Sequence, residues 1–196
     1  MTAVRIPSEL TPYLELLGDV LERSAPIEAV YLIGSAASGA YEHGRSDVDV
    51  IAVTSRSLSH DERRTLAAAV EVLPVPARKL ELVVYPRGSD SWEINLNTPD
   101  GDTAEHLGLD PDLEPSFWFV VDRAIAAQHA LPLVGPEWEE LFAPESHEAI
   151  QAALTEADAF DGWDDPRGRE LAAARSRAWR ETGRWISKPE AQEWIA

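Results

Sequence analysis

Residues 31–53, YLIGSAASGAYEHGRSDVDVIAV, decide the fold that we predict for this chain. The β-branched and aromatic run that ends at Ile33 predicts a strand, and the small residues from Gly34 onward let the backbone turn tightly into a brief helix. Such a turn leaves amide N–H groups free to bind a phosphate. A second strand follows at residues 47–53, so the stretch predicts two strands joined through a phosphate-binding turn.

Two aspartates lie on the second strand of this stretch. Because side chains alternate along a strand, Asp47 and Asp49 project from one face while Val48 and Val50 point into the core. Neighbouring carboxylates repel each other and resist burial unless a cation compensates their charge. Oxygen ligands beside a phosphate-binding turn suit Mg²⁺, whereas two solvated acids on an exposed edge strand are the alternative interpretation.

The pair of motifs GS at residues 34–35 and SDVD at residues 46–49 resembles the signature of the polymerase-β-like nucleotidyltransferase superfamily. Within it, the whole chain is similar to the aminoglycoside 3″-adenylyltransferases, the streptomycin and spectinomycin resistance enzymes. The resemblance implies an α+β fold, in which a mixed β-sheet is flanked by helices and followed by a small C-terminal α-helical lobe.

The same resemblance implies a substrate pair and a set of site residues. ATP is the implied co-substrate, and AMP is transferred to a hydroxyl of an aminoglycoside-like antibiotic. Asp47 and Asp49 are implied to hold two Mg²⁺ ions. The implied nucleotide-binding residues of this region are Gly34, Ser35 and Ser46.

A third strand is predicted at residues 79–85, KLELVVY, and it carries an acid near its start. Alternation places Glu81 on one face with Lys79, opposite Leu80 and Leu82. We expect this strand to lie beside the strand of the two aspartates, so that three carboxylates converge. By resemblance, Glu81 matches the family's third acid, which is thought to deprotonate the substrate hydroxyl, a step that needs a positioned base. A purely metal-binding or structural Glu81 is the alternative.

The composition limits which classes of partner and site the chain can have. The 17 basic and 35 acidic residues give a formal charge of −18, which argues against a general nucleic-acid binder and favours small cationic partners. Solubility, or adaptation to a salty cytoplasm, would explain the acidity equally well. The absence of cysteine excludes disulfides, thiolate metal sites and a cysteine nucleophile.

Neither a signal peptide nor a membrane span is predicted. The first residues, MTAVRIPSEL, lack the apolar core of a signal peptide, and no apolar run approaches the roughly 20 residues that cross a bilayer. We therefore expect a cytoplasmic protein without membrane partners, present as a monomer or a weak oligomer.

Helices are predicted at residues 11–24, 59–73 and 117–130, where apolar side chains recur with helical spacing. Arg123, in the third of these, is interpreted as an exposed charge. Residues 92–96 alternate like a short edge strand. By resemblance, Trp92 is a candidate for substrate contact, because family members often carry a tryptophan here for the drug; a packing aromatic is the alternative.

A domain boundary is predicted just after residues 133–136, LVGP, which break the chain and resemble the family's turn between its two lobes. We assign residues 1–143 to a nucleotidyltransferase catalytic domain and residues 144–196 to a C-terminal helical lobe that closes on nucleotide and substrate. Three helices are expected in this lobe, at residues 146–159, 166–182 and 188–195. So short a lobe buries little surface alone, so we expect it to pack on the first domain and form a ligand-binding cleft.

Two basic residues of the lobe match positions at which the family contacts the nucleotide phosphates. They are Arg175 and Lys188, which stand on either side of Gly183. Lys188 also lies at a predicted helix start, where free N–H groups favour phosphate. An ordinary helix-surface arginine and a residue within a capping box are the alternatives.

Three further residues of the lobe match the family's contacts with the cationic substrate or lie between them. Asp161 and Asp165 match its acids, although Asp165 followed by Pro166 is also a good helix start. Trp163, between them, is either a stacking surface for a sugar or part of the lobe's small core.

The sequence therefore predicts a Mg²⁺-dependent adenylyltransferase that acts on a small cationic substrate. Two alternatives stay open. One is a nucleotidyltransferase that modifies a protein partner, as small antitoxin-type members do. The other is a catalytically degenerate module that binds a nucleotide without turnover.

Overall fold

The sheet is built around β1 (Ile27–Ile33) and β2 (Val48–Thr54), the strands on either side of the Gly-Ser turn. The computed structural model describes residues 6–101, 104–163 and 165–195. β1 and β2 pair antiparallel, whereas β2 and β3 (Leu80–Pro86) pair in parallel and need a crossover connection, which α3 (His60–Glu71) provides. The third strand therefore lies beside the strand of the aspartates, as the sequence predicts.

Three shorter strands complete a six-stranded sheet in the order β5-β4-β3-β2-β1-β6. They are β4 (Ile94–Asn97), β5 (His106–Gly108) and β6 (Leu131–Val134), and all pair antiparallel. The mixed sheet confirms the predicted fold class. The prediction of an edge strand at 92–96 is wrong, because β5 covers β4. The predicted chain break at 133–136 overlaps the end of a strand, β6, which pairs with β1 on the side away from β2.

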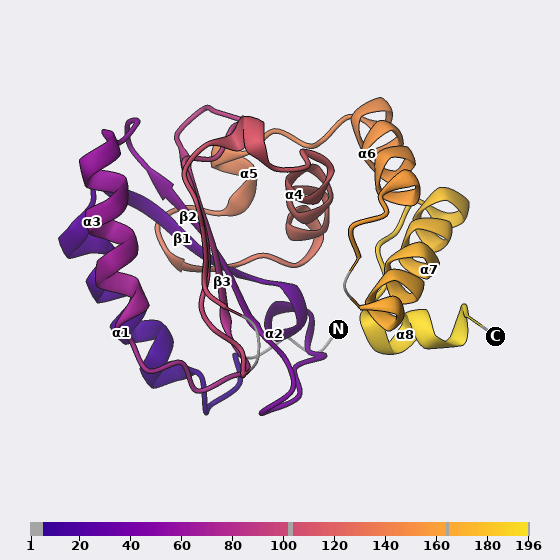
Figure 1. Ribbon diagram of the computed structural model, residues 1–196, viewed down its shortest axis with the longest axis horizontal. Helices are drawn as coiled ribbons and strands as arrows, with labels where there is room; N and C mark the ends of the chain where they lie inside the picture. The colour runs from indigo at the N-terminus through magenta and orange to yellow at the C-terminus, as the bar shows by residue number, and fades with distance from the viewer. Residues whose placement is uncertain (1–5, 102–103, 164, 196) are drawn as a thin grey trace. The chain divides into compact units, whose positions relative to one another are not determined.

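Two helices cover one face of the sheet (Figure 1): α1 (Thr11–Ser24) and α3 lie side by side there. Leu14, Leu17 and Leu21 of α1 repeat at helical spacing and are buried in the main core. From the sheet, this core takes the alternate side chains Val30, Leu32, Val48, Val50, Ala52, Leu80, Leu82 and Val84. Alternation therefore directs Asp49 and Glu81 to the opposite face of the sheet.

The opposite face is covered at its far end by an aromatic cluster. Tyr31 meets Trp138 of α5 (Trp138–Leu141) edge to face at a centroid distance of 5.2 Å, and Tyr85 meets Phe142 at 5.7 Å. The hydroxyl of Tyr31 donates to the carbonyl oxygen of Pro136 at 2.9 Å, and burial raises its pKa to about 12. The acids lie at the other end of this face, away from the aromatic cluster.

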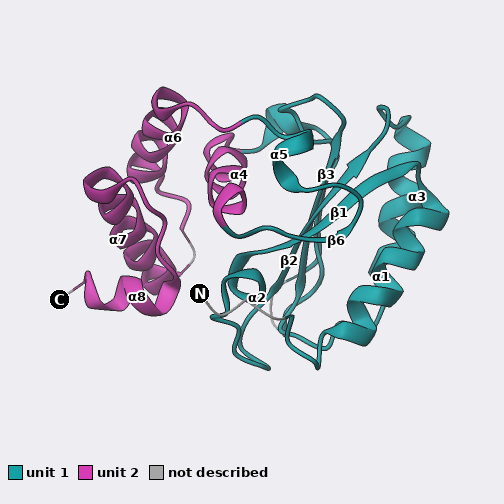
Figure 2. Cartoon of the chain, turned by 180° about the vertical axis from the view of Figure 1, so that it is seen from behind, with its two compact units in different colours: residues 1–114, 129–143 teal, residues 115–128, 144–196 magenta. Residues whose placement is uncertain are grey.

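The chain divides into two compact units, coloured separately in Figure 2. Unit 1 comprises Met1–Glu114 and His129–Ala143, and unit 2 comprises Pro115–Gln128 and Pro144–Ala196. Residues 115–128, which the prediction assigned to the first domain, therefore cluster with the C-terminal helices. The division of labour between a catalytic domain (1–143) and a closing lobe (144–196) stays a prediction.

Unit 2 consists of α4 (Phe117–His129, whose last residue falls in unit 1), α6 (His147–Ala159), α7 (Pro166–Thr182) and α8 (Lys188–Glu193). Helices were predicted at these last three positions. The small core gathers Ala124, Ile150, Leu154, Trp179 and Trp185. Among the described residues, no helix is long and apolar enough to span a membrane.

Arg123 of α4 is buried, with 6% of its surface exposed, so its interpretation as an exposed charge is wrong. Its Nε donates to Glu145 Oε1 at 2.7 Å, in the segment that leads into α6. The ion pair lies within unit 2 and compensates the burial of the guanidinium. Helical periodicity alone did not reveal this partner.

The start of α3 allows a test of local stability. Ser59 accepts a hydrogen bond from the N–H of Glu62, whose carboxylate accepts one from the N–H of Ser59 at 2.8 Å, which forms a capping box. Ser59→Ala is expected to lower the free energy of unfolding by about 1 kcal/mol, measured in urea, because one N–H group at the helix start loses its partner. Ser57→Ala, at an exposed neighbour, is the control, and an equal loss in both variants would contradict the capping role.

Candidate active site

Three carboxylates converge at the start of β2 and β3. Asp49 pairs in register with Glu81 across the parallel strands, and Asp47 directly precedes β2. One oxygen from each side chain lies within 4.8 Å of the others, and all three residues are half-buried. The structure thus brings together the three acids that strand alternation placed on one face.

Gly34 brings the turn after β1 directly against Asp49. Its φ is +65°, in the left-handed region that favours glycine. A Cβ at this position would overlap Asp49 Oδ2 and would lie 2.7 Å from Asp49 Cγ. The glycine is therefore required both by the turn and by the close approach of the backbone to a carboxylate.

The other predicted nucleotide-binding residues of unit 1 flank this turn. Ser35 is half-buried in α2 (Gly34–Ser38), and its carbonyl oxygen accepts from the hydroxyl of Ser38 at 3.3 Å. Ser46 Oγ accepts a hydrogen bond from the N–H of Glu42 at 3.0 Å, which holds the loop before Asp47. Their contact with a nucleotide stays a prediction.

Two basic residues that sequence reasoning did not assign to the site contact its acids. Arg78 forms a bidentate ion pair with Asp47, in which Nε donates to Oδ1 at 2.8 Å and Nη2 donates to Oδ2 at 3.1 Å. Its Nε also lies 3.2 Å from Oδ2 of Asp100. Hydrogen bonding to Asp47 raises the pKa of Arg78, so the guanidinium stays charged. Lys79 Nζ lies 2.6 Å from Glu81 Oε1. Consecutive basic residues directly before an acid-bearing strand were the signal in the sequence.

The donor set fits a hard divalent cation. Three carboxylates supply only oxygen ligands, from rigid positions on or next to paired strands, which is the chemistry that Mg²⁺ prefers. The close approach of Gly34 leaves backbone rather than a side chain beside Asp49. Asp47, Asp49 and Glu81 are therefore the residues that could hold a metal ion.

The two predicted phosphate contacts of unit 2 lie around the α7–α8 connection. Arg175 Nε donates to the carbonyl oxygen of Ile186 at 2.9 Å, which ties α7 to the segment before α8. Lys188 is exposed at the first residue of α8, inside a capping box formed by Ser187 and Glu190. Both alternative interpretations are compatible with these contacts, and the phosphate roles stay predictions.

The predicted acids of unit 2 lie before and at the start of α7. Asp165 is its N-cap, because its carboxylate accepts from the N–H groups of Arg167 and Gly168, each at 2.9 Å. Asp161 is exposed. A structural role for Asp165 is therefore present, while substrate contact by either acid stays a prediction.

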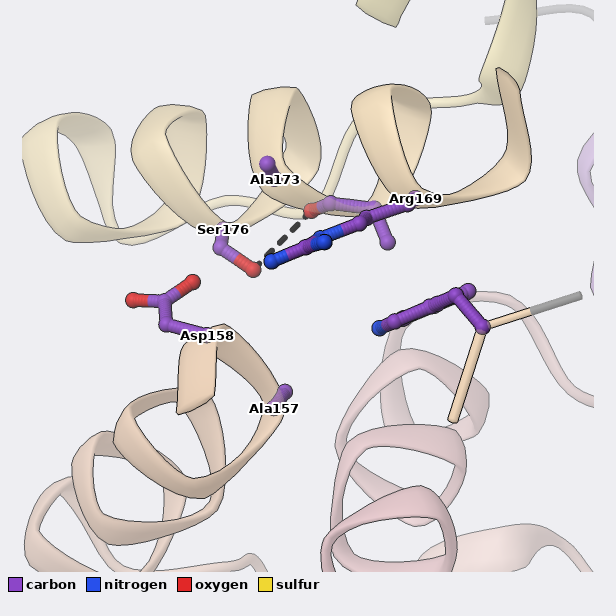
Figure 3. Close-up of a pocket in the computed structure, with 7 residues that line it drawn as sticks. Ala157, Asp158, Arg169, Ala173 and Ser176 are labelled. Atoms are coloured by element: carbon purple, nitrogen blue, oxygen red, sulfur yellow. Dashed lines mark hydrogen bonds between the residues drawn. The ribbon is translucent and has the colours of Figure 1, made fainter. Parts of the chain in front are cut away.

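Trp163 contributes to both interpretations made for it. It meets Trp118 edge to face at 4.8 Å, within the aromatic packing of unit 2. It also lines a small cavity of about 140 Å³. Figure 3 shows Asp158 from α6, and Arg169 and Ser176 from α7, around this cavity. The indole nitrogen of Trp163 is buried and has no hydrogen-bond partner among the described residues.

Trp92 is buried, with 2% of its surface exposed, and lies just before β4. A Cβ at Gly108 of β5 would lie 3.0 Å from its ring. This close packing favours the interpretation as a packing aromatic over the proposed drug contact.

Comparison with known proteins agrees with this geometry. Residues 15–95 match the family model described as polymerase beta, nucleotidyltransferase, and this range includes β1, β2, β3 and all three acids. No curated protein matches the chain.

Two solved structures align with the chain. The spectinomycin adenyltransferase AAD(9) from Enterococcus faecialis, solved with ATP and spectinomycin, aligns with a TM-score of 0.71 and 15% identity, over 93% of this chain and 79% of that one. A toxin-antitoxin structure with AMP-PNP aligns with a TM-score of 0.37 and 13% identity, over 72% of this chain and 84% of that one. Residues 15–95 therefore match the polymerase-β-like nucleotidyltransferase family, in a chain that resembles the spectinomycin adenyltransferase AAD(9) in fold.

Proposed function

We propose that this protein transfers AMP from ATP to a hydroxyl of a small cationic, aminoglycoside-like substrate and releases pyrophosphate. The observation that carries the proposal is the convergence of Asp47, Asp49 and Glu81 against the Gly34 turn. The fold similarity to AAD(9), which was solved with ATP and spectinomycin, supports the choice of substrates. The formal charge of −18 favours a cation.

Glu81 is the proposed general base. The substrate hydroxyl gives its proton to the Glu81 carboxylate, and the oxygen forms a bond to the α-phosphorus of ATP. The bond between this phosphorus and the oxygen that bridges to the β-phosphate breaks, and its electron pair leaves with pyrophosphate. A hydroxyl with a pKa far above neutral needs such a base, and Glu81, with 39% of its side chain exposed, is accessible to a substrate.

Asp47 and Asp49 are the residues that would hold two Mg²⁺ ions, which supply positive charge against the charge that develops on the phosphates. The Gly34 turn, Ser35 and Ser46 bind the nucleotide in this proposal, since turn N–H groups suit phosphate oxygens. Arg78 keeps the Asp47 carboxylate oriented through its two-point contact.

Unit 2 supplies the remaining contacts in this proposal. Arg175 and Lys188 bind the phosphates, while Asp161, Asp165 and Trp163 bind the cationic substrate. Trp92 is no longer favoured for this role, because its side chain is buried. The reaction takes place in the cytoplasm, where ATP and Mg²⁺ are abundant.

The proposal is tested by mass spectrometry on reactions that contain the purified protein, ATP, Mg²⁺ and a panel of aminoglycosides that includes streptomycin and spectinomycin. We expect one drug to gain the mass of AMP, and we expect EDTA to abolish the product because the three acids need a cation. Adding excess Mg²⁺ after EDTA is the control and should restore it. If ATP binds with Mg²⁺ but no drug gains mass, the aminoglycoside proposal fails.

A further inference from the structure

The contact between Lys79 and Glu81 places a cation of the chain itself on the proposed base. The two residues are two positions apart on one face of the strand, and their charged atoms are 2.6 Å apart. Lys79 is largely buried, with 17% of its side chain exposed, whereas Glu81 is 39% exposed. The lysine is therefore the more buried partner, and the pair is less screened than a typical surface ion pair.

Lys79 differs from its neighbour Arg78 in how it is held. The side chain of Arg78 contacts Asp47 and Asp100, and its backbone N–H donates to the carbonyl oxygen of Ser46 at 3.2 Å. This bidentate contact leaves a lone pair on each Asp47 oxygen, so Arg78 orients the carboxylate without preventing it from binding a metal ion. Lys79 is a flexible chain with a compact charge, and its ion pair is made to one oxygen of Glu81.

We propose that Lys79 is a resident counter-cation that competes with a divalent cation for Glu81, and thereby sets the affinity of the three acids for metal. The inference rests on the proposed function in that Glu81 belongs to a metal-assisted site. An oxygen of Glu81 lies within 4.8 Å of oxygens from Asp47 and Asp49, so any cation shared by the three acids meets the Lys79 charge at close range.

The consequence is a positioning role for Lys79. The ammonium holds Glu81 next to the two aspartates despite their mutual repulsion. A divalent cation that contacts one oxygen of Glu81 displaces Lys79, and the other oxygen of Glu81 is then available to take the proton of the substrate hydroxyl. Glu81 is therefore held in place before the divalent cation binds, and it is released from the ammonium when the cation binds.

The first test measures the binding of Mn²⁺ alone, from the loss of the free-ion EPR signal, to the full chain at physiological salt. Lys79→Met removes the charge and keeps a similar length of side chain, and we expect it to bind Mn²⁺ about 10-fold more tightly than the wild type. Arg87→Met is the matched control. Arg87 directly follows the C-terminal end of β3 and forms an ion pair with Glu28. It lies about 20 Å from Glu81 along the strand, which is beyond the electrostatic screening length of about 8 Å.

The second test needs no substitution. The sequence contains two lysines, Lys79 and Lys188, so amine labelling read by mass spectrometry reports on each separately. We expect Mg²⁺ to speed the labelling of Lys79 in the wild type, because its ammonium leaves Glu81. Lys188, which is exposed and belongs to unit 2, should label at an unchanged rate.

The outcomes separate this inference from the proposed function, because neither test involves ATP or turnover. An Mn²⁺ affinity of Lys79→Met that equals the wild type's or is weaker, or a Lys79 labelling rate that Mg²⁺ leaves unchanged, would overturn the competition. Tighter Mn²⁺ binding by Lys79→Met, together with no transfer of AMP by the wild type, would uphold the inference and overturn the proposed reaction.

Discussion

Glu81→Gln is expected to lower kcat for AMP transfer by about 10²- to 10⁴-fold, the usual contribution of a positioned general base. Glutamine preserves the size of the side chain but cannot accept the proton of the substrate hydroxyl. Asp47 and Asp49 remain in place to hold the cations, so kcat should change by a much larger factor than the KM for ATP. The measurement is steady-state kinetics with the drug that accepts AMP, together with ATP binding by calorimetry in the presence of Mg²⁺.

A suitable control for Glu81→Gln is Glu22→Gln, which removes one charge from an exposed position on α1. It should leave kcat unchanged. A Glu81→Gln variant that loses ATP and Mg²⁺ binding in proportion to its activity would show that lost metal binding, and not lost proton transfer, explains the loss of activity. Full activity in this variant would exclude both roles.

Gly34→Ala is expected to reduce kcat/KM by about 100-fold or more, because a misplacement of about 1 Å at a reacting centre can cost that much. The added Cβ would overlap the carboxylate of Asp49, which must turn away from Asp47 and Glu81. The positive φ adds a destabilisation of about 1–2 kcal/mol. Kinetics, Mn²⁺ binding and urea unfolding together measure these effects.

The matched control for Gly34→Ala is Gly88→Ala. Gly88 has a φ of +72° and no atom within 4 Å of an added Cβ, so the variant carries the same backbone strain without the clash. We expect both variants to lose similar stability and only Gly34→Ala to lose metal binding. If the two variants lose activity equally, backbone strain rather than contact with Asp49 explains the glycine.

Local patterns were sufficient to predict the elements that carry the acids. The alternation around Asp49 and Glu81 identified two strands and their shared face, and the parallel register confirms that they are neighbours. The helical spacing of the C-terminal segment likewise identified α6, α7 and α8. Such patterns depend only on residues that are close together in the sequence, so they hold in any fold that buries the apolar side of the strand or helix.

Features that depend on distant partners could not be predicted in this way. β6 has four residues, one of them a proline, and forms a strand only because Leu131 pairs with Leu32 of β1. Arg123 is buried because Glu145 compensates its charge. The fork of Arg78 on Asp47 joins residues that precede two different strands. Each of these contacts is made by residues far apart in the sequence, where periodicity carries no information.

The crossover through α3 also links chemistry to the order of folding. Asp49 and Glu81 meet only after β2 and β3 pair in parallel around α3, whereas β3 and β4 are joined as antiparallel neighbours along the chain. Pairings between distant segments form more slowly than local ones, so the site completes later than the β3–β4 hairpin. A ligand of the acids binds only the completed pairing and therefore stabilises that pairing by mass action. Occupancy of the site would thus protect the crossover unit from unfolding and proteolysis.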